Sequence, residues 1–547
     1  MGERVCVLET PSRTRRISVA SSPIRSPKPP TCLAASDRFC DTAWAPLAVG
    51  ILTPRTLLGP LRANIKPPAS PAAAAPPAMA EVFNLLALVP LDCADGLRVR
   101  SAIRSSMIEF SSVTSRYPLQ RLPSEAWQHP RPSVAAVTGY WAAMTPELLS
   151  TEPLRAQFPG LSPEVAALDG AGGTQVPQAV IDAVAEALVT TMANEGGAFA
   201  ASQVSDQVVA DARIAIADLV GGVPAGVVLG PSMTTLTFRI ADTLSRAWRP
   251  GDEVVVTSLD HDANIRPWWL AAERAGATVR VAEFDVETGE LPVEAVESVL
   301  SDRTRLVAVT AASNAIGTRP DVRAICDATH DAGGLTYVDG VHATPHVPTD
   351  VAALGADFYA CSSYKFFGPH TGAVVADPAL LEGLRPAKLL PATDAVPGRF
   401  EQGTPPFELL AGVRAAVDWL AGLTDAPGDR RTRLLATFAA IETRLQDLLA
   451  QLVAGLSAID GVRLLGAPRL RTSTVSFVVE GRTPKAVAAD LAGEGIAVWD
   501  GDNYAYELMS RYGLAESGGA IRAAIVAYTT AEEVDRLVAS VAAIAGR

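Results

Sequence analysis

Lys365 is the residue whose type and position are best suited to covalent chemistry. It follows the apolar segment 357–361, which is typical of a buried strand, and a loop with glycine and proline comes after it. An amine at such a strand end can form a Schiff base with an aldehyde. Most loop lysines are merely solvated, but a second apolar segment, 335–338, ends in Asp339. The two residues together predict a site for an aldehyde cofactor whose ring nitrogen needs a carboxylate partner.

Apolar segments that alternate with helical patterns would position these two residues. Strands are expected at 226–230, 253–257, 278–282, 305–310, 335–338, 357–361 and 373–376. This alternation predicts an α/β fold with a doubly wound, seven-stranded, mainly parallel sheet. The loop between the last two strands is too short for a parallel crossover, so that pair is expected to be antiparallel. Ligands of such sheets bind beyond the carboxyl ends of the strands.

A smaller α/β unit is expected towards the C-terminus. Residues 409–456 have a long helical pattern, and strands are expected near 462–465, 472–479, 495–499 and 521–526. The last helix, 531–544, has Thr530 as its cap and glutamates in its first turn. We therefore divide the body of the chain into a large domain, 144–400, and an interdomain helix with a small domain, 401–547.

Residues 1–143 differ from the rest of the chain. They are rich in proline, serine and alanine and show no sustained periodicity, which predicts a disordered extension. The apolar run 82–91 is too short to cross a membrane. A transit peptide is a second interpretation, although acids and prolines are unusual in one. A third, which we favour, is a natural start at Met144, because the threonine and proline that follow are typical of a helix start.

The composition narrows the class of protein. The 547 residues are 48% hydrophobic and 19% charged, with a net charge of −13, which indicates a well-packed enzyme and disfavours a nucleic-acid partner. The cysteines, at 6, 32, 40, 93, 326 and 361, form no CxxC motif, so no metal site is expected. Reduced thiols in a cytoplasmic protein are the simplest interpretation. Cys361 is expected to be a core residue rather than a reactive one.

Five motifs, in order, give the chain a resemblance to a known family. They lie at 230–235, 259–264, 313–317, 339–342 with 362–365, and 399–404. Together they resemble the class V aminotransferase family of pyridoxal-phosphate (PLP) enzymes, and within it the cysteine desulfurase-like branch. The resemblance covers roughly residues 145–547. It implies the PLP-dependent transferase-like fold (fold type I), with a large PLP-binding domain and a small C-terminal domain.

The resemblance also implies a role for individual residues. Lys365 would hold the cofactor and move the substrate's Cα proton, Asp339 would pair with the pyridine nitrogen, and His261 would stack on the ring. Further cofactor contacts are implied for Ser232, Met233, Thr234, Asn314, His342, Ser362, Tyr364 and Thr404. The substrate would be bound by Asn314 and Arg522. In the family the threonine at position 404 reaches the phosphate of a partner subunit, so a homodimer is expected.

The implied function is that of a PLP enzyme of amino-acid metabolism, which forms an external aldimine and abstracts the Cα proton. A cysteine desulfurase also needs a thiolate in a mobile loop of the small domain. The corresponding segment here, 499–508, has no cysteine, and none follows Cys361. We therefore expect transamination, epimerisation or C–S lysis without persulfide chemistry. A true desulfurase that uses an external thiol and a non-catalytic PLP-binding protein are the alternatives. No membrane partner is expected.

Overall fold

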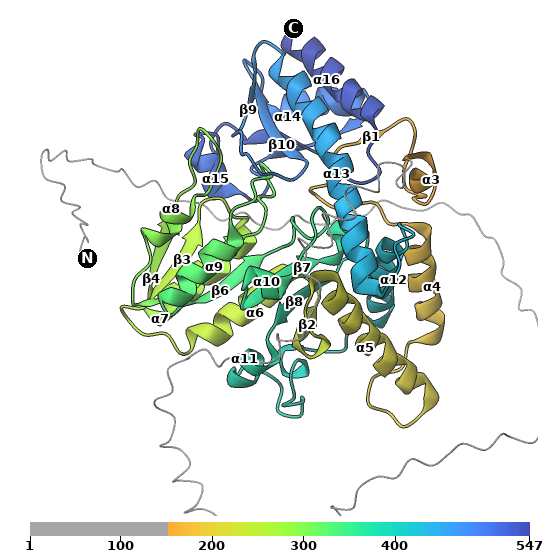
Figure 1. Ribbon diagram of the computed structural model, residues 1–547, viewed down its shortest axis with the longest axis vertical. Coiled ribbons are helices and arrows are strands. Elements are labelled where there is room, and N and C mark those ends of the chain that lie inside the picture. Colours follow the sequence, from red (N-terminus) through yellow and green to blue (C-terminus); the bar gives the residue numbers. More distant parts are fainter. Residues whose placement is uncertain (1–150) are drawn as a thin grey trace, which may run out of the picture. The chain divides into compact units, whose positions relative to one another are not determined.

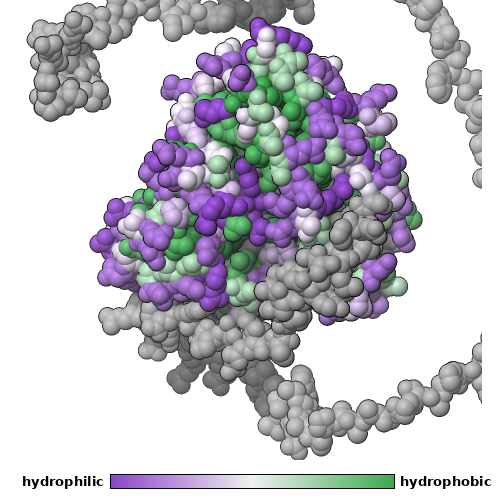
Figure 2. Space-filling model, turned by 45° about the horizontal axis from the view of Figure 1, so that its top comes forward, coloured by the Kyte–Doolittle hydropathy of each residue, from purple (hydrophilic) through white to green (hydrophobic). Residues whose placement is uncertain are grey.

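The structure is a computed structural model that describes residues 151–547. The interpretations of residues 1–143, including a start at Met144, lie outside the described residues. Within residues 151–547, no helix is both long enough and apolar enough to cross a membrane. The face drawn in Figure 2 carries hydrophilic residues with smaller hydrophobic areas between them.

A seven-stranded sheet forms the centre of the large domain (Figure 1). Its order is β2-β8-β7-β6-β5-β3-β4. The strands are β2 (Val227–Gly230), β3 (Glu253–Thr257), β4 (Thr278–Ala282), β5 (Thr304–Thr310), β6 (Leu335–Asp339), β7 (Phe358–Ser362) and β8 (Gly372–Ala376). β8 is antiparallel to both of its neighbours, while the other pairs are parallel. The mainly parallel sheet and its antiparallel pair are thus confirmed.

Successive residues of a strand point to opposite sides of the sheet, so these apolar strands give the sheet two apolar faces. Helices cover both of them. Val254 and Val256 of β3 belong to one hydrophobic cluster, which α6 (Met233–Ser245), α7 (Arg266–Ala275) and α11 (Pro378–Gly383) complete. Val255 belongs to the larger cluster on the other face. The helices on or beside that face are α4 (Gln178–Thr190), α5 (Ala200–Val220), α8 (Val293–Glu297), α9 (Val322–Asp331), α10 (Val351–Leu354) and α12 (Phe407–Ala421).

A four-stranded antiparallel sheet of order β12-β13-β10-β9 forms the small unit. Its strands are β9 (Val462–Leu464), β10 (Thr474–Val479), β12 (Trp499–Gly501) and β13 (Ala520–Ala524). Its helices are α14 (Pro484–Gly493), α15 (Tyr506–Arg511) and α16 (Ala531–Ala545). Thr530 caps α16 in a complete capping box with Glu533, as the sequence predicts.

The strand expected at 495–499 is two strands. β11 (Ile496–Ala497) pairs in parallel with β1 (Ala166–Ala167), and Val498 separates it from β12, which pairs with β13. The apolar run 495–499 therefore contributes one strand to each of two sheets, because the chain changes its pairing partner at Val498. The small unit thereby includes a segment from the beginning of the described chain, near α3 (Thr151–Arg155).

A long helix, α13 (Arg430–Ser457), connects the two parts of the fold (Figure 1). Asp429 caps it, and its buried leucines lie along its whole length. One end contacts α5 and α12, while the other contacts α16 and β9. This continuous packing fixes the small sheet relative to the edge of the large one.

Candidate active site

The carboxyl ends of β2, β3, β5, β6 and β7 lie along one edge of the large sheet, because these strands all run in the same direction. The chain segments that leave this edge carry predicted site residues: Ser232, Met233 and Thr234 after β2, His261 after β3, Asn314 after β5, His342 after β6, and Tyr364 and Lys365 after β7. Asp339 and Ser362 are the last residues of their strands. The topology therefore gathers residues that are far apart in sequence.

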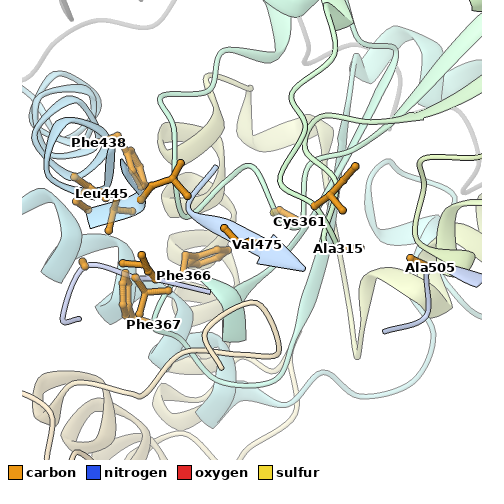
Figure 3. Packing of buried hydrophobic residues seen from close by; sticks show 14 of the residues in the cluster. Ala315, Cys361, Phe366, Phe367, Phe438, Leu445, Val475 and Ala505 are labelled. Carbon is orange, nitrogen blue, oxygen red and sulfur yellow. The ribbon is translucent and has the colours of Figure 1, made fainter. Parts of the chain in front are cut away.

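The loop of Lys365 is anchored by the two residues that follow it. Phe366 and Phe367 are fully buried in the larger hydrophobic cluster (Figure 3). Phe367 takes the left-handed φ of 67°, and its N–H donates to Thr174 Oγ1 at 2.8 Å. These contacts hold η4 (Ser363–Lys365) against the sheet edge.

The Lys365 amine lies in a buried, electropositive environment. Its Nζ donates to the carbonyl oxygen of Ala171. Burial, followed by the charge of Arg522, lowers the pKa of Lys365 to about 7, and Asp339 opposes this shift only in part. A lysine with this pKa has a large fraction of neutral, nucleophilic amine at physiological pH.

Asp339 is buried close enough to Lys365 for each to shift the other's pKa. Burial raises the pKa of Asp339 to about 6, and a 2.9 Å hydrogen bond from the Val341 N–H to Oδ1 and the charge of Lys365 act against that rise. Because the paired donor named above is a single backbone N–H, an ion pair with a cation would stabilise the buried Asp339 carboxylate.

His261 is a neutral imidazole with a defined tautomer. Its Nδ1 accepts a 3.0 Å hydrogen bond from the Ala263 N–H, so the proton belongs on Nε2. Burial lowers its pKa to about 3, with further contributions from Lys365 and Arg522. The imidazole is therefore uncharged at neutral pH and adds no second positive charge beside Lys365.

Tyr504 was not among the residues predicted from the sequence, yet it contacts His261. The two rings stack with centroids 5.4 Å apart and planes 15° apart. The backbone carbonyl oxygen of Tyr504 also accepts a 2.7 Å hydrogen bond from the Asp262 N–H. The segment 499–508 stands out in the sequence only because it lacks cysteine, so its contact with His261 requires the tertiary structure.

Asp260 does not pair with its neighbour His261 but supports the turn that carries it. Its carboxyl group accepts hydrogen bonds from Thr257 Oγ1 and, at 2.6 Å, from Asn264 Nδ2. Asn264 Oδ1 accepts in turn from Trp268 Nε1 at 3.2 Å. Burial raises the pKa of Asp260 to about 8. This buried network fixes the position of the imidazole.

Asn314 and Arg522 lie next to each other, as expected for residues that share a ligand. Arg522 Nη1 donates to the backbone oxygen of Asn314 at 3.0 Å, and Asn314 Nδ2 donates to the Asn503 carbonyl at 2.8 Å. Burial lowers the pKa of Arg522 to about 10, so it remains charged at neutral pH, with Asp169 as a nearby acid. A buried guanidinium of this kind suits a carboxylate.

His342 belongs to a buried polar cluster between the two sheets. Its Nε2 lies 3.1 Å from Thr472 Oγ1 and 3.0 Å from Thr474 Oγ1, and its ring lies 4.9 Å from that of His346. Burial, followed by His346, lowers the pKa of His342 well below its ordinary value. His342 therefore joins the strand end of β6 to β10 of the small unit.

The start of α6 lies beside the end of β7. Ser232 caps the helix by accepting a 3.1 Å hydrogen bond from the Thr235 N–H. Gly372 pairs with Ser362, and a Cβ on Gly372 would collide with the backbone nitrogen of Met233. Only glycine permits this approach, which brings the first N–H groups of α6 next to the buried Ser362.

The remaining predicted residues have different surroundings. Tyr364 is partly buried and stacks on His370, with centroids 5.0 Å apart and planes 14° apart. Thr404 is exposed, and within residues 151–547 no hydrogen bond joins it to the other predicted residues. The structure therefore does not bring Thr404 into the same site of one subunit.

Four buried polar atoms of the predicted site residues have no hydrogen-bond partner within residues 151–547: Asn314 Oδ1, His342 Nδ1, Ser362 Oγ and Arg522 Nε. Buried polar atoms are seldom left unpaired in a protein unless a ligand or water satisfies them. Together with the Lys365 amine and the Asp339 carboxyl group, they fit a polar, anionic aldehyde such as PLP.

The two cysteines among residues 151–547, Cys326 and Cys361, are both buried. Burial raises the pKa of each thiol to about 12, so each is protonated at neutral pH. Cys361 packs in the larger hydrophobic cluster with Val475 and Ala315 (Figure 3), which confirms its expected place in the core.

Comparisons with known proteins agree with this geometry. Residues 166–537 match the aminotransferase class-V family. The chain is 35% identical to the uncharacterized protein MT3887 of Mycobacterium tuberculosis (strain CDC 1551 / Oshkosh), over 72% of this chain and 98% of that protein. It is 32% identical to a probable cysteine desulfurase of Vibrio cholerae, again over 72% and 98%. The crystal structure of the cysteine desulfurase CsdA of Escherichia coli is 27% identical, with a TM-score of 0.63, over 72% of this chain and 97% of that one.

Proposed function

Because the chain belongs to the class V aminotransferase family, whose enzymes depend on PLP, we propose that it binds PLP and removes the Cα proton of an amino acid. The single observation that carries this proposal is the buried Lys365 amine beside Asp339, at a strand edge where further buried polar atoms have no hydrogen-bond partner within residues 151–547. The cofactor, when bound, supplies an electron sink for the charge that develops at Cα.

Each residue has a task in holding the cofactor and substrate. Lys365 would hold the aldehyde carbon covalently, and Asp339 would pair with the ring nitrogen. The Ser362 hydroxyl and the first N–H groups of α6, which the close approach of Met233 to Gly372 brings beside it, would donate hydrogen bonds to the phosphate. Arg522 would hold the substrate carboxylate, which places Cα near the lysine.

Once the substrate amine has replaced Lys365 at the aldehyde carbon, the freed lysine amine would move the Cα proton, because its lowered pKa allows it to accept and return a proton near pH 7. His261, held neutral, would stack on the cofactor and can donate from Nε2. The same arrangement serves transamination, epimerisation or C–S lysis, since all begin with the loss of this proton.

A test of this proposal measures the proton directly. The PLP-loaded protein is incubated in D₂O with each of the twenty amino acids, and NMR follows the Cα hydrogen. At least one amino acid should exchange hydrogen for deuterium at a rate that depends on the protein. If none exchanges, while PLP is bound to Lys365, the proposed proton transfer is wrong.

Persulfide chemistry is not part of the proposal, although several relatives are named as probable cysteine desulfurases. With L-cysteine, no sulfur should be added to Cys326 or Cys361, because both thiols are buried and protonated. The measurement is intact mass after alkylation. An added sulfur atom that forms at the rate of cysteine turnover would restore the desulfurase interpretation.

We also propose a homodimer, in which Thr404 reaches the partner's site. Thr404 is exposed within one chain. Large apolar side chains near it in sequence are exposed as well, with Leu389 at 70% and Leu390 at 96%. Exposed leucines of this kind are typical of an interface, which supports the proposal.

A further inference from the structure

Two exposed aromatic side chains, Trp499 and Tyr504, lie beside the candidate site. Trp499 is 51% exposed and Tyr504 is 72% exposed. Neither is needed to hold the cofactor in the proposed function. Large aromatic residues are costly to leave in water, and they are favoured where they contact a ligand.

Trp499 lies on the same side of its sheet as Arg522. β12 and β13 are antiparallel, and Trp499 stands directly opposite Arg522 in their register. Directly opposed residues have Cβ atoms about 5 Å apart and project to the same face. A substrate whose carboxylate binds Arg522 would therefore have the indole within reach.

The indole also approaches the backbone next to Lys365. A Cβ on Gly172 would collide with Trp499 Nε1, so only glycine allows the ring to lie there. The preceding residue, Ala171, is the one whose carbonyl oxygen accepts from Lys365 Nζ. Trp499 thus lies opposite the carboxylate-binding residue in the sheet and beside the segment 171–172, whose Ala171 carbonyl accepts from the reactive amine.

Tyr504 is positioned by its own backbone. Asn503 and Tyr504 take left-handed φ values of 54° and 56°, which are unusual for residues other than glycine. The Asn503 carbonyl accepts from Asn314, and the Tyr504 ring stacks on His261. The loop therefore holds the Tyr504 ring against His261 and the Asn503 backbone against Asn314.

The acids near these rings do not favour a cationic side chain. Asp500 stands opposite Ile521, so it projects to the other face of the sheet from Trp499. Asp502 Oδ1 accepts from the Tyr504 N–H at 2.9 Å. Glu507 lies 3.9 Å from Arg266. Asp169 also lies near Arg522, and its charge acts on that guanidinium. The surface that Trp499 and Tyr504 themselves add beside Arg522 is aromatic rather than acidic.

We infer that Trp499 and Tyr504 form a side-chain subsite that selects α-amino acids with an aromatic side chain. The inference rests on the proposed function, because Arg522 must bind the substrate carboxylate. An aromatic ring in this subsite would stack on the indole and phenol, whereas a small or charged side chain would leave both rings in water.

The first experiment measures binding without any reaction. Calorimetry with the PLP-loaded protein compares 3-phenylpropanoate with propanoate, which share a carboxylate but lack an amine. The wild type should prefer 3-phenylpropanoate, and Trp499→Ala and Tyr504→Ala should each weaken its binding about tenfold, the size of one aromatic contact. Tyr504→Phe should retain the preference. Tyr506→Ala is the control, because Tyr506 is 50% exposed and no hydrogen bond or ring contact within residues 151–547 joins its side chain to the site residues described above, so this change should leave the preference unaltered.

The second experiment repeats the comparison with the D₂O exchange of L-phenylalanine, L-alanine, L-lysine and L-glutamate. Exchange of phenylalanine should be the most efficient and should fall selectively in Trp499→Ala. A preference for lysine or glutamate, or a preference for phenylalanine that survives both alanine substitutions, would overturn the inference while leaving the proposed function intact. Absence of exchange with every amino acid would instead count against the proposed function.

Discussion

Lys365→Ala should abolish both covalent attachment of PLP and exchange of the Cα proton. Borohydride treatment of the wild type, followed by digestion and mass spectrometry, should place the cofactor on the peptide that contains Lys365. The chain has five lysines, at 28, 66, 365, 388 and 485, so the assignment is unambiguous. Removal of a catalytic nucleophile commonly costs several orders of magnitude in rate.

The pH dependence of this attachment follows from the pKa of Lys365. Burial lowers it to about 7, and only the neutral amine attacks an aldehyde. Attachment to the cofactor-free protein should therefore accelerate as the pH rises from 6 to 8, rather than near the ordinary pKa of a lysine. Lys388→Ala is the control, because its amine donates to the Ala392 carbonyl at 2.7 Å, away from the site. A cofactor found on Lys388 would contradict the assignment.

Asp339→Asn should leave the fold intact but slow the Cα exchange by a factor of about 10²–10³, the usual effect of removing one preorganised electrostatic partner. Asparagine retains an Oδ1 that can accept from the Val341 N–H, so the local turn should be preserved. It cannot carry the negative charge that keeps a pyridine nitrogen protonated. The rate is measured on protein saturated with PLP, so that weaker binding does not mimic a slower reaction.

A second measurement on Asp339 uses binding alone. Burial raises its pKa to about 6, so in the cofactor-free protein the carboxyl group gains a proton as the pH falls through 6. The affinity for PLP should decline over that range in the wild type, and this decline should be weaker in Asp339→Asn. Asp377→Asn is the matched control, since Asp377 is a buried acid that caps α11 and asparagine caps helices equally well. Identical pH profiles for wild type and Asp339→Asn would refute the assigned role.

The sequence by itself determined the large sheet and the positions of Lys365 and Asp339. Strand identity depends on short apolar runs, and the end of a strand is marked by the polar residue or glycine that follows it. Because parallel strands end at a common edge, the sequence alone is enough to place the two residues together. The short loop before β8 also sufficed to predict an antiparallel pair.

Only the tertiary structure decided which residues from the small unit enter the site. The division of 495–499 into β11 and β12 sets the register that places Trp499 opposite Arg522, and that register depends on pairing with β1 and β13. The contact of Tyr504 with His261 joins segments from different sheets. Such contacts are set by long-range packing and strand register, which local periodicity does not encode, so the residues that would recognise a substrate side chain emerge only from the folded chain.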